Sequence, residues 1–321
     1  MKILLHIARF IVGGLFIFSG AVKLIDPIGS QYKFEEYFSE GVLNMEFLIP
    51  YALYFAIFLI VSEIYLGFAV LLGYRAKAVM KYVVVMIIFF LFLTWYSAYF
   101  DKVTDCGCFG DAIKLTPWES FYKDVVLTIL ILFLYKNRAK IYPYFSKEAT
   151  TTITILSFII SLCIAIYIVN HLPPVDFRAY AIGKNIPEGM EYKGDGKIPP
   201  VHDFFLENDQ NDLAPKILAA DKVMLVIMAS LEKSEYKGFP EIKKIADEAL
   251  KKGYEVYGVS ASFAEIIEMT KKRYNLPFEV LFCDETTLKT MIRANPGVMI
   301  LNKGTIVDKK HWRDLDDLEL K

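Results

Sequence analysis

The sequence has 321 residues, of which 55% are apolar, with a formal net charge of −1 and a mean hydropathy of +0.37. Apolar residues usually make up about 45–50% of a soluble protein, so the composition excludes a wholly soluble chain and a disordered one. The near-neutral charge offers no basic face for nucleic acid, and four cysteines are too few for a disulfide-rich secreted fold. Residues 173–321 carry 47 of the 73 charged residues, which indicates a membrane part followed by a soluble part.

Five long apolar runs occupy the first half of the chain. Most of them reach the roughly 18–20 residues that are needed to cross the hydrocarbon core of a bilayer. They predict five transmembrane helices, and the first is expected to stay uncleaved because no signal-peptide cleavage site follows it. The runs are 3–24, 49–73, 78–100, 118–135 and 151–172, of which the fourth is the shortest and contains Lys123 and Asp124.

The loop charges predict an orientation. With the N-terminus in the cytoplasm, nine Lys and Arg residues lie in inner segments and about four lie in outer loops, which is the usual positive-inside bias. Five spans then place the loop 101–117 and everything after residue 172 on the outer side. We therefore expect a multi-pass protein of the bacterial inner membrane with a periplasmic C-terminal domain.

The second half alternates strand and helix patterns after a Pro- and Gly-rich linker, residues 173–200. This alternation, closed by a hairpin that turns at Lys303–Gly304, predicts an α/β layer with a mostly parallel sheet. The expected strands are 223–229, 254–260, 278–283, 298–301 and 305–309, and the expected helices are 236–252, 263–274 and 285–293.

The segment Cys106-Gly107-Cys108 lies in the outer loop. Glycine gives the backbone freedom that a small disulfide ring needs, and a strained disulfide in an oxidising compartment is readily reduced. The segment is therefore a candidate thiol–disulfide exchange centre. The alternatives are a permanent staple, a turn with two free thiols or a metal site, for which two ligands without a nearby histidine are too few.

Several charged residues are placed at or inside the expected membrane boundary. Lys23 ends the first span and Asp124 lies about two turns into the fourth. Because buried charges are costly and usually paired, these two residues are expected to pair beside the cysteines, where a cation lowers the pKa of a thiol. The alternative is ordinary anchoring at the helix ends.

Glu63 is the clearest charge inside a span, with Arg9 as its expected partner. The pair is either a proton-handling or quinone-binding group, or a buried structural ion pair. Cys163 and Cys283 are expected to be packing residues, with a reactive role for Cys283 as the alternative.

The first 135 residues resemble the DoxX/MauE superfamily of small membrane proteins. The resemblance rests on three motifs: Arg9-x3-Gly13-Gly14-x-Phe16-x2-Ser19-Gly20-x2-Lys23-Leu24-x-Asp26-Pro27, Glu63-x3-Gly67-x5-Gly73, and Asp105-Cys-Gly-Cys-Phe-Gly110. It implies a four-helix membrane core and a link to disulfide formation in exported proteins. The core is also similar to that of quinone-linked thiol oxidases of the vitamin K epoxide reductase type, which implies a quinone as cofactor. Those enzymes use Cys-x-x-Cys and usually a second cysteine pair, whereas this chain has only Cys-x-Cys.

Residues 200–315 resemble thioredoxin-like domains of the TlpA/peroxiredoxin kind, through their strand order and Asn295-Pro296-Gly297 before a strand. The resemblance implies a cis bond at Asn295–Pro296. The family's Cys-x-x-Cys is replaced here by Ala229-Ser-Leu-Glu-Lys-Ser-Glu235, so this domain is not expected to be an oxidoreductase by itself.

The expected fold is thus a membrane helical bundle followed by an α/β thioredoxin-like domain. The expected parts are a four-helix core (1–135), an inner loop with the fifth span (136–172), the linker (173–200) and an extracytoplasmic domain (201–321). The expected function is extracytoplasmic thiol–disulfide redox chemistry on a protein partner. The alternative is a non-catalytic component of an envelope assembly, with the second domain as a docking module.

Overall fold

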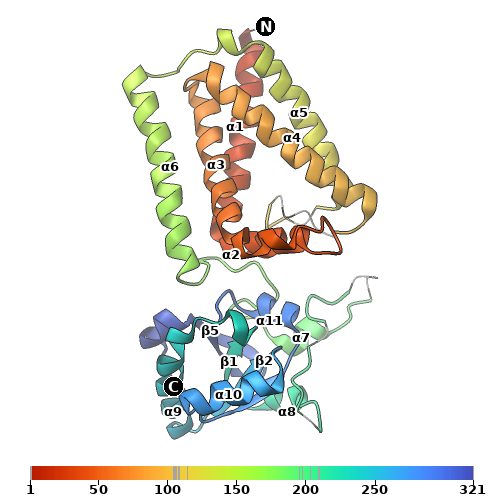
Figure 1. Cartoon of the computed structure of the whole chain (residues 1–321), viewed down its shortest axis with the longest axis vertical. Helices are drawn as coiled ribbons and strands as arrows, with labels where there is room; N and C mark the ends of the chain where they lie inside the picture. The colour runs from red at the N-terminus through yellow and green to blue at the C-terminus, as the bar shows by residue number, and fades with distance from the viewer. Residues whose placement is uncertain are drawn as a thin grey trace. The chain divides into compact units, whose positions relative to one another are not determined.

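The computed structural model describes residues 2–103, 107, 109–113, 115–194, 196, 198–202, 204–208 and 210–320. The chain divides into two compact units, Met1–Val169 and Asn170–Lys321, which Figure 1 shows in the colours of the chain. Each unit has its own hydrophobic core, and each is described by itself below.

The first unit is helical throughout its regular structure. Helices α1, α3, α4 and α5 form a bundle, α2 lies across one end of it, and α6 packs along α3 (Figure 1). We refer below to the end of the bundle where α2 lies as the α2 end. The elements are α1 (Lys2–Ile25), α2 (Pro27–Phe38), η1 (Glu46–Tyr51), α3 (Ala52–Leu72), α4 (Ala76–Phe100), α5 (Pro117–Lys136), η2 (Arg138–Lys140) and α6 (Lys147–Val169).

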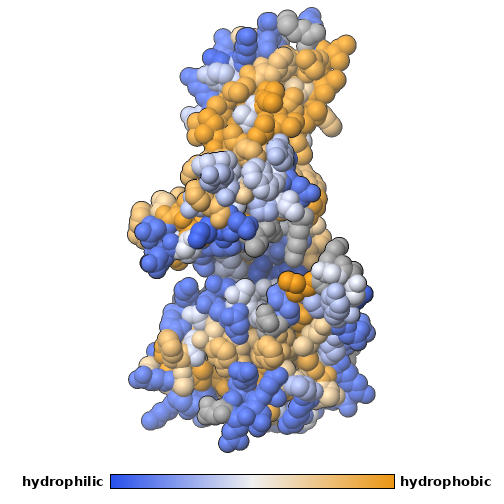
Figure 2. Space-filling model, turned by 90° about the vertical axis from the view of Figure 1, so that its right-hand side faces the viewer, coloured by the Kyte–Doolittle hydropathy of each residue, from blue (hydrophilic) through white to orange (hydrophobic). Residues whose placement is uncertain are grey.

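Four helical stretches of the described chain are long and apolar enough to cross a membrane: Lys2–Ile25, Glu46–Leu72, Ala76–Phe100 and Lys147–Val169. The fourth expected span is present as helix α5, which packs along α4, but it is not among these four. Its first half carries Glu119, Lys123 and Asp124, which reduce its apolar character. Hydrophobic side chains cover much of the surface of this unit, as Figure 2 shows for one face. These features make the chain a multi-pass membrane protein.

Three glycines bring the backbones of α1 and α3 close together. A Cβ atom on Gly13 would lie 2.9 Å from the carbonyl oxygen of Gly67, and one on Gly67 would lie 2.8 Å from the backbone nitrogen of Ile17. A Cβ atom on Gly20 would lie 3.1 Å from the nitrogen of Ile64. Small residues drive helix association in membranes because they permit this approach. The glycines therefore determine how α1 crosses α3.

The second unit contains a five-stranded sheet in the order β3-β2-β1-β4-β5. Strands β1, β2 and β3 are parallel, whereas β4 is antiparallel to β1 and to β5. The expected mostly parallel sheet is therefore a mixed one. The strands are β1 (Val223–Met228), β2 (Glu255–Ser260), β3 (Glu279–Phe282), β4 (Gly297–Asn302) and β5 (Thr305–His311), and the main helices are α9 (Phe239–Lys251), α10 (Ala264–Tyr274) and α11 (Glu285–Met291). The expected cis bond at Asn295–Pro296 is confirmed.

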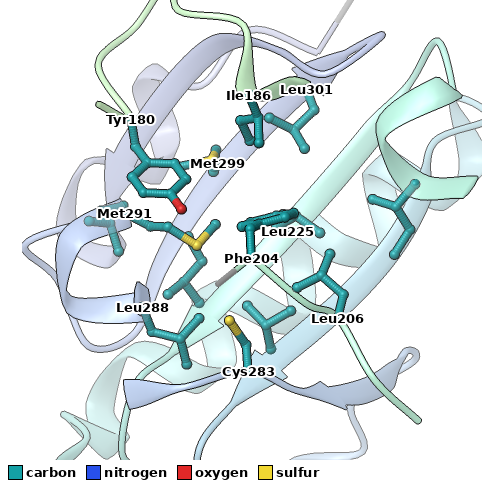
Figure 3. Close-up of a cluster of buried hydrophobic side chains, with 14 of the residues drawn as sticks. Tyr180, Ile186, Phe204, Leu206, Leu225, Cys283, Leu288, Met291, Met299 and Leu301 are labelled. Carbon is teal, nitrogen blue, oxygen red and sulfur yellow. The ribbon is translucent and has the colours of Figure 1, made fainter. Parts of the chain in front are cut away.

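The segment expected to be a linker contributes to the core of this unit. Tyr180 and Ile186 are buried in the cluster that also contains Phe204 and Cys283 (Figure 3). The segment also includes the short helix α7 (Ile186–Met190), and the amide of Ile186 donates to the carbonyl of Gly304 in the β4–β5 turn. Its prolines and glycines therefore shape a strap along the edge of the sheet, and the second unit begins at Asn170.

The close contact of α1 and α3 at Gly13, Gly20 and Gly67, which we call the glycine crossing, predicts how substitutions there affect stability. Gly67→Ala should lower the free energy of unfolding by about 1–3 kcal/mol, since overpacking a close helix contact forces the backbones apart. Gly14→Ala is the matched control, because a Cβ atom there meets nothing within 4 Å. Denaturant titration in detergent measures both, and equal effects of the two substitutions would contradict the role of the crossing.

Candidate functional site

A buried ion pair joins α1 to α3. The ammonium of Lys23 lies 2.7 and 2.9 Å from the two carboxylate oxygens of Glu63. It also donates to the hydroxyl of Ser19 at 2.8 Å, and that hydroxyl itself lies within hydrogen-bond distance of Glu63. Lys23 is 4% exposed and Glu63 is 1% exposed. All three donors of the Lys23 ammonium are thus used inside the bundle.

Asp124 has different partners from the one expected. Its carboxylate lies 3.0 Å from the ammonium of Lys123 and accepts a hydrogen bond from the hydroxyl of Thr94 at 3.1 Å. Lys23 and Asp124 line the same cavity, as expected, but the expected direct pair between them is wrong, because Lys23 pairs with Glu63. The reason is register: the glycine crossing brings Lys23 beside Glu63, while Asp124 faces α4 and the residue that precedes it on α5.

Arg9 is also not the partner of Glu63. Its guanidinium donates to the carbonyls of Val70 and Leu71 at the end of α3 and to that of Tyr142, and it lies over the ring of Tyr144. The last carbonyls of a helix have no partner within the helix, so Arg9 closes the end of α3. Arg9 and Lys23 are 14 residues apart, or about 21 Å along a helix, which separates Arg9 from the ion pair.

Four charged side chains line one cavity of about 20 Å³. We call Lys23, Glu63, Lys123 and Asp124 the charge cluster. A second cavity, of about 40 Å³, is lined by Lys23 and by residues of α2 and α4. The formal charges within the cluster cancel, which lowers the cost of burying them.

Cys106 and Cys108 lie outside the described residues, but three of their near neighbours in the chain are described. Gly107 lines the second cavity and Phe109 lines the first. The ring of Phe109 packs against Phe18 and lies 4.8 Å from the ammonium of Lys123. Gly110 has a φ of +52° and adjoins the backbone of α1. Gly107 and Phe109 are thus placed beside residues of the charge cluster.

The two cavities are small compared with the pockets that hold organic ligands, which measure about 300–1,000 Å³. The smaller one has room for about one water molecule. Within the described part of the chain, no group of three His, Cys, Asp or Glu side chains is placed to hold a metal ion.

In the second unit, serines and a glutamate follow β1 at the place where the thioredoxin-like resemblance implies cysteines. The carboxylate of Glu232 accepts from the hydroxyls of Ser230 and Ser262, at 2.8 and 2.7 Å. The hydrogen bond from its own backbone amide, followed by those from Ser262 and Ser230, lowers the pKa of Glu232. Asn295, just before the cis proline, donates to the carbonyl of Ser230 and accepts from Ser234. The loop after β1 is therefore held by hydrogen bonds within it and to Ser262 and Asn295.

The surroundings of the Cys283 thiol make it unreactive. Cys283 is 1% exposed and lies among Leu288, Met291 and Phe204 (Figure 3). Burial raises the pKa of its thiol to about 12, and only a thiolate attacks a disulfide. A packing role, the first expectation for Cys283, fits this environment.

Sequence reasoning did not identify Lys123 and Thr94 as partners of Asp124. Lys123 precedes Asp124 directly in the chain, and this adjacency of opposite charges in one helix could have predicted their ion pair. Thr94 had no such signal, because its role depends on the packing of α4 against α5.

The ion pair makes a prediction of its own. Lys23→Met and Glu63→Gln should each lower the free energy of unfolding by about 3–5 kcal/mol, because each leaves a buried charge without its partner. The double variant Lys23→Met/Glu63→Gln should lose less than the sum of the two. Denaturant titration of the four proteins in detergent measures this coupling, and additive losses would show that the two side chains act independently.

A buried histidine predicts that the second unit loses stability in acid. His311 is 2% exposed, and its Nδ1 accepts from the amide of Arg313. Burial is the main cause that lowers the pKa of His311 to about 4. The nearby carboxylates of Glu235 and Asp314 raise this pKa, and the positive charges of Arg313 and His171 lower it. In the unfolded chain the pKa is about 6.5. Between these values only the unfolded state binds the proton, so stability is fully present above pH 6.5 and is lost as the pH falls towards 4.

The expected loss is up to about 3 kcal/mol, from 1.36 kcal/mol per pKa unit. Urea titrations of the full chain at pH 7 and pH 5, followed through the adjacent Trp312, measure it. His311→Gln should reduce the difference between the two pH values. His202→Gln, at an exposed site, should leave it unchanged, and a similar effect of both variants would contradict the assignment.

A comparison with known protein families matches the first unit. Residues 1–136 match the family described as methylamine utilisation protein MauE. That range covers α1 to α5 and thus contains the charge cluster and the Cys-Gly-Cys segment. No curated protein matches the chain. The first 136 residues therefore form a MauE-family membrane domain, to which the α/β unit is joined through α6.

Proposed function

We propose that this protein carries out thiol–disulfide exchange at the outer face of the bacterial inner membrane through Cys106 and Cys108. The observation that carries the proposal is the placement of their chain neighbours: Gly107 and Phe109 line the two cavities that Lys23 also lines. Positive charge beside a thiol favours the thiolate, and the proposal places the two thiols next to these described neighbours.

The proposed reaction balances between two cysteine pairs. A thiolate of the reduced protein partner attacks the Cys106–Cys108 disulfide and forms a mixed disulfide. The second thiolate of the partner then attacks the partner's own sulfur in the mixed disulfide and releases the second cysteine as a thiolate. Two electrons and two protons pass from the partner to Cys106 and Cys108, and the partner gains a disulfide. Lys23 and Asp124 are proposed to assist through the charge cluster.

Re-oxidation of the pair needs a two-electron acceptor, for which we propose a membrane quinone that takes up the two electrons and two protons. In the described contacts Glu63 pairs with Lys23, and Arg9 donates to a carbonyl at the end of α3; a proton-handling or quinone-binding role of Glu63 and Arg9 stays a prediction.

The proposed topology has five spans, with α5 as the fourth, the N-terminus in the cytoplasm and the C-terminal unit in the periplasm. It rests on the excess of Lys and Arg in the inner segments. In this topology α2, the Cys-Gly-Cys segment and the second unit all share the outer side of the membrane.

We propose that the second unit is a thioredoxin-like domain that binds the partner without exchanging electrons. The strand order and the cis bond at Asn295–Pro296 support the fold. The loop after β1 has no cysteine and Cys283 is buried, which supports the lack of redox activity. The same observations favour the alternative function, a non-catalytic envelope component in which Cys106 and Cys108 form a permanent staple.

Cysteine substitutions separate the two functions. In the redox account, Cys106→Ser and Cys108→Ser each abolish oxidation of a reduced dithiol peptide by membranes that contain the protein, and one of the two retains a partner in a mixed disulfide. The controls Cys163→Ser and Cys283→Ser should keep full activity. If the serine variants at 106 and 108 lower only stability and trap no partner on non-reducing gels, the staple account holds instead.

A further inference from the structure

The end of the bundle opposite the α2 end carries a ring of positive charges. Helix α1 begins there, α3 and α5 end there, and α4 and α6 begin there (Figure 1). Residues 1–9, 73–81 and 136–148 contain nine Lys and Arg against one acidic residue, Glu148. Apart from the buried Arg9, the cations are Lys2, Arg75, Lys77, Lys81, Lys136, Arg138, Lys140 and Lys147, which we call the basic rim.

The charges of the basic rim are not compensated within the part of the chain that the structure describes. Seven of the eight side chains are exposed, and Arg138 is half-buried. None of the eight takes part in an ion pair among the described residues. Arg138 donates to the carbonyl of Tyr135, and Lys140 donates to the side-chain oxygen of Asn137. Both acceptors are neutral, so the positive charges stay available to a ligand from outside the chain.

The α2 end of the same bundle has the opposite character. The segments 23–46 and 101–124 carry ten Asp and Glu against five Lys. Three of these lysines, Lys23, Lys33 and Lys123, pair with a carboxylate in the described structure. The excess of positive charge is therefore confined to the end with the basic rim, and a negatively charged ligand is favoured at that end alone.

Arg9 holds the loop between α5 and α6, which carries part of the basic rim. Its guanidinium donates to the carbonyl of Tyr142 at 3.2 Å and lies 4.2 Å from the centroid of the Tyr144 ring. The amide of Tyr144 donates to the carbonyl of Leu72 at the end of α3, and its hydroxyl lies 2.7 Å from His6 of α1. The short helix η2 of the same loop packs against α4 and α5. The cations of the loop and those of α4 thus belong to one fixed surface.

Aromatic side chains accompany the basic rim and point to the kind of ligand. Tyr82, Tyr142, Tyr144 and Phe145 are all at least half exposed. Tyrosine is favoured at the level of the lipid headgroups, because its ring is apolar while its hydroxyl stays in water. Lys and Arg form charge-assisted hydrogen bonds with phosphate oxygens. Uncompensated cations and exposed rings on the same end of a membrane bundle therefore fit the headgroup layer of a bilayer.

We propose that the basic rim binds anionic phospholipids in preference to zwitterionic ones. Both classes carry a phosphate, but only an anionic lipid such as phosphatidylglycerol has a net negative charge. One Lys or Arg near an anionic membrane surface strengthens the attraction by roughly fivefold. This binding does not depend on the proposed exchange reaction and is the same in either orientation of the protein.

The test uses the full chain in detergent micelles that contain equal amounts of phosphatidylglycerol and phosphatidylcholine with the same acyl chains. The immobilised protein is washed, and its bound lipids are counted by mass spectrometry. Phosphatidylglycerol should be enriched on the parent protein. Lys77→Gln/Lys81→Gln/Lys140→Gln should lower the constant for exchange of one lipid for the other at least about fivefold, which is the contribution of a single cation. Arginine at the same three positions should preserve the enrichment.

The matched control removes three exposed lysines of the second unit and so changes the net charge by the same amount. Lys237→Gln/Lys251→Gln/Lys272→Gln should leave the enrichment unchanged. A second measurement needs no substitution: raising the salt from about 0.1 M to about 1 M shortens the screening length from about 10 Å to about 3 Å, so the enrichment on the parent should fall.

Three results would overturn the proposal. One is binding of the two lipids in proportion to their amounts by the parent, and another is an equal loss of enrichment in the rim variant and in the control. The third is displacement of the bound phosphatidylglycerol by excess inorganic phosphate at constant ionic strength, which would assign the basic rim to free phosphate.

Discussion

The Lys23–Glu63 ion pair is the constraint on which the membrane unit depends. A charge left alone inside a bilayer is costly, so each of the two side chains stabilises the bundle only while the other stays beside it. The glycine crossing keeps them together: Gly13, Gly20 and Gly67 let α1 and α3 approach until the ammonium lies 2.7 Å from the carboxylate. The charge cluster, the two cavities and Gly107 all lie around this pair.

The structure shows which contacts the motif residues of the first and second spans make. The glycines form the crossing, Ser19 and Lys23 hold Glu63, and Arg9 closes the end of α3 near Gly73. Long apolar runs were sufficient to predict the five long helices of the membrane unit, but not α2, which contains no long apolar run. They were not sufficient to pair the charges, because helix register depends on backbone contacts between residues about 50 apart in the chain. That is why Lys23 was matched with Asp124, and Arg9 with Glu63, from sequence alone.

The second unit shows the same division between local and tertiary information. Strand periods and the Lys303–Gly304 turn predicted the strands and the hairpin, and Asn295-Pro296 gave the cis bond through the family resemblance. The strap around Tyr180 and Ile186 was missed because proline and glycine suggest a linker, whereas here they shape a segment that buries two large side chains. The antiparallel pairing of β4 with β1 was also missed, since it depends on topology and not on local pattern.

We propose that the buried pair organises a bundle whose Cys-Gly-Cys segment cycles between thiol and disulfide. The most direct measurement is the redox state of Cys106 and Cys108 in growing cells, followed by acid quenching and thiol labelling after a short pulse of reductant. The account predicts that the pair is reduced by the pulse and becomes oxidised again after its removal, and that recovery is slower in Lys23→Met. A pair that remains oxidised through the pulse, or never recovers from it, would contradict the account.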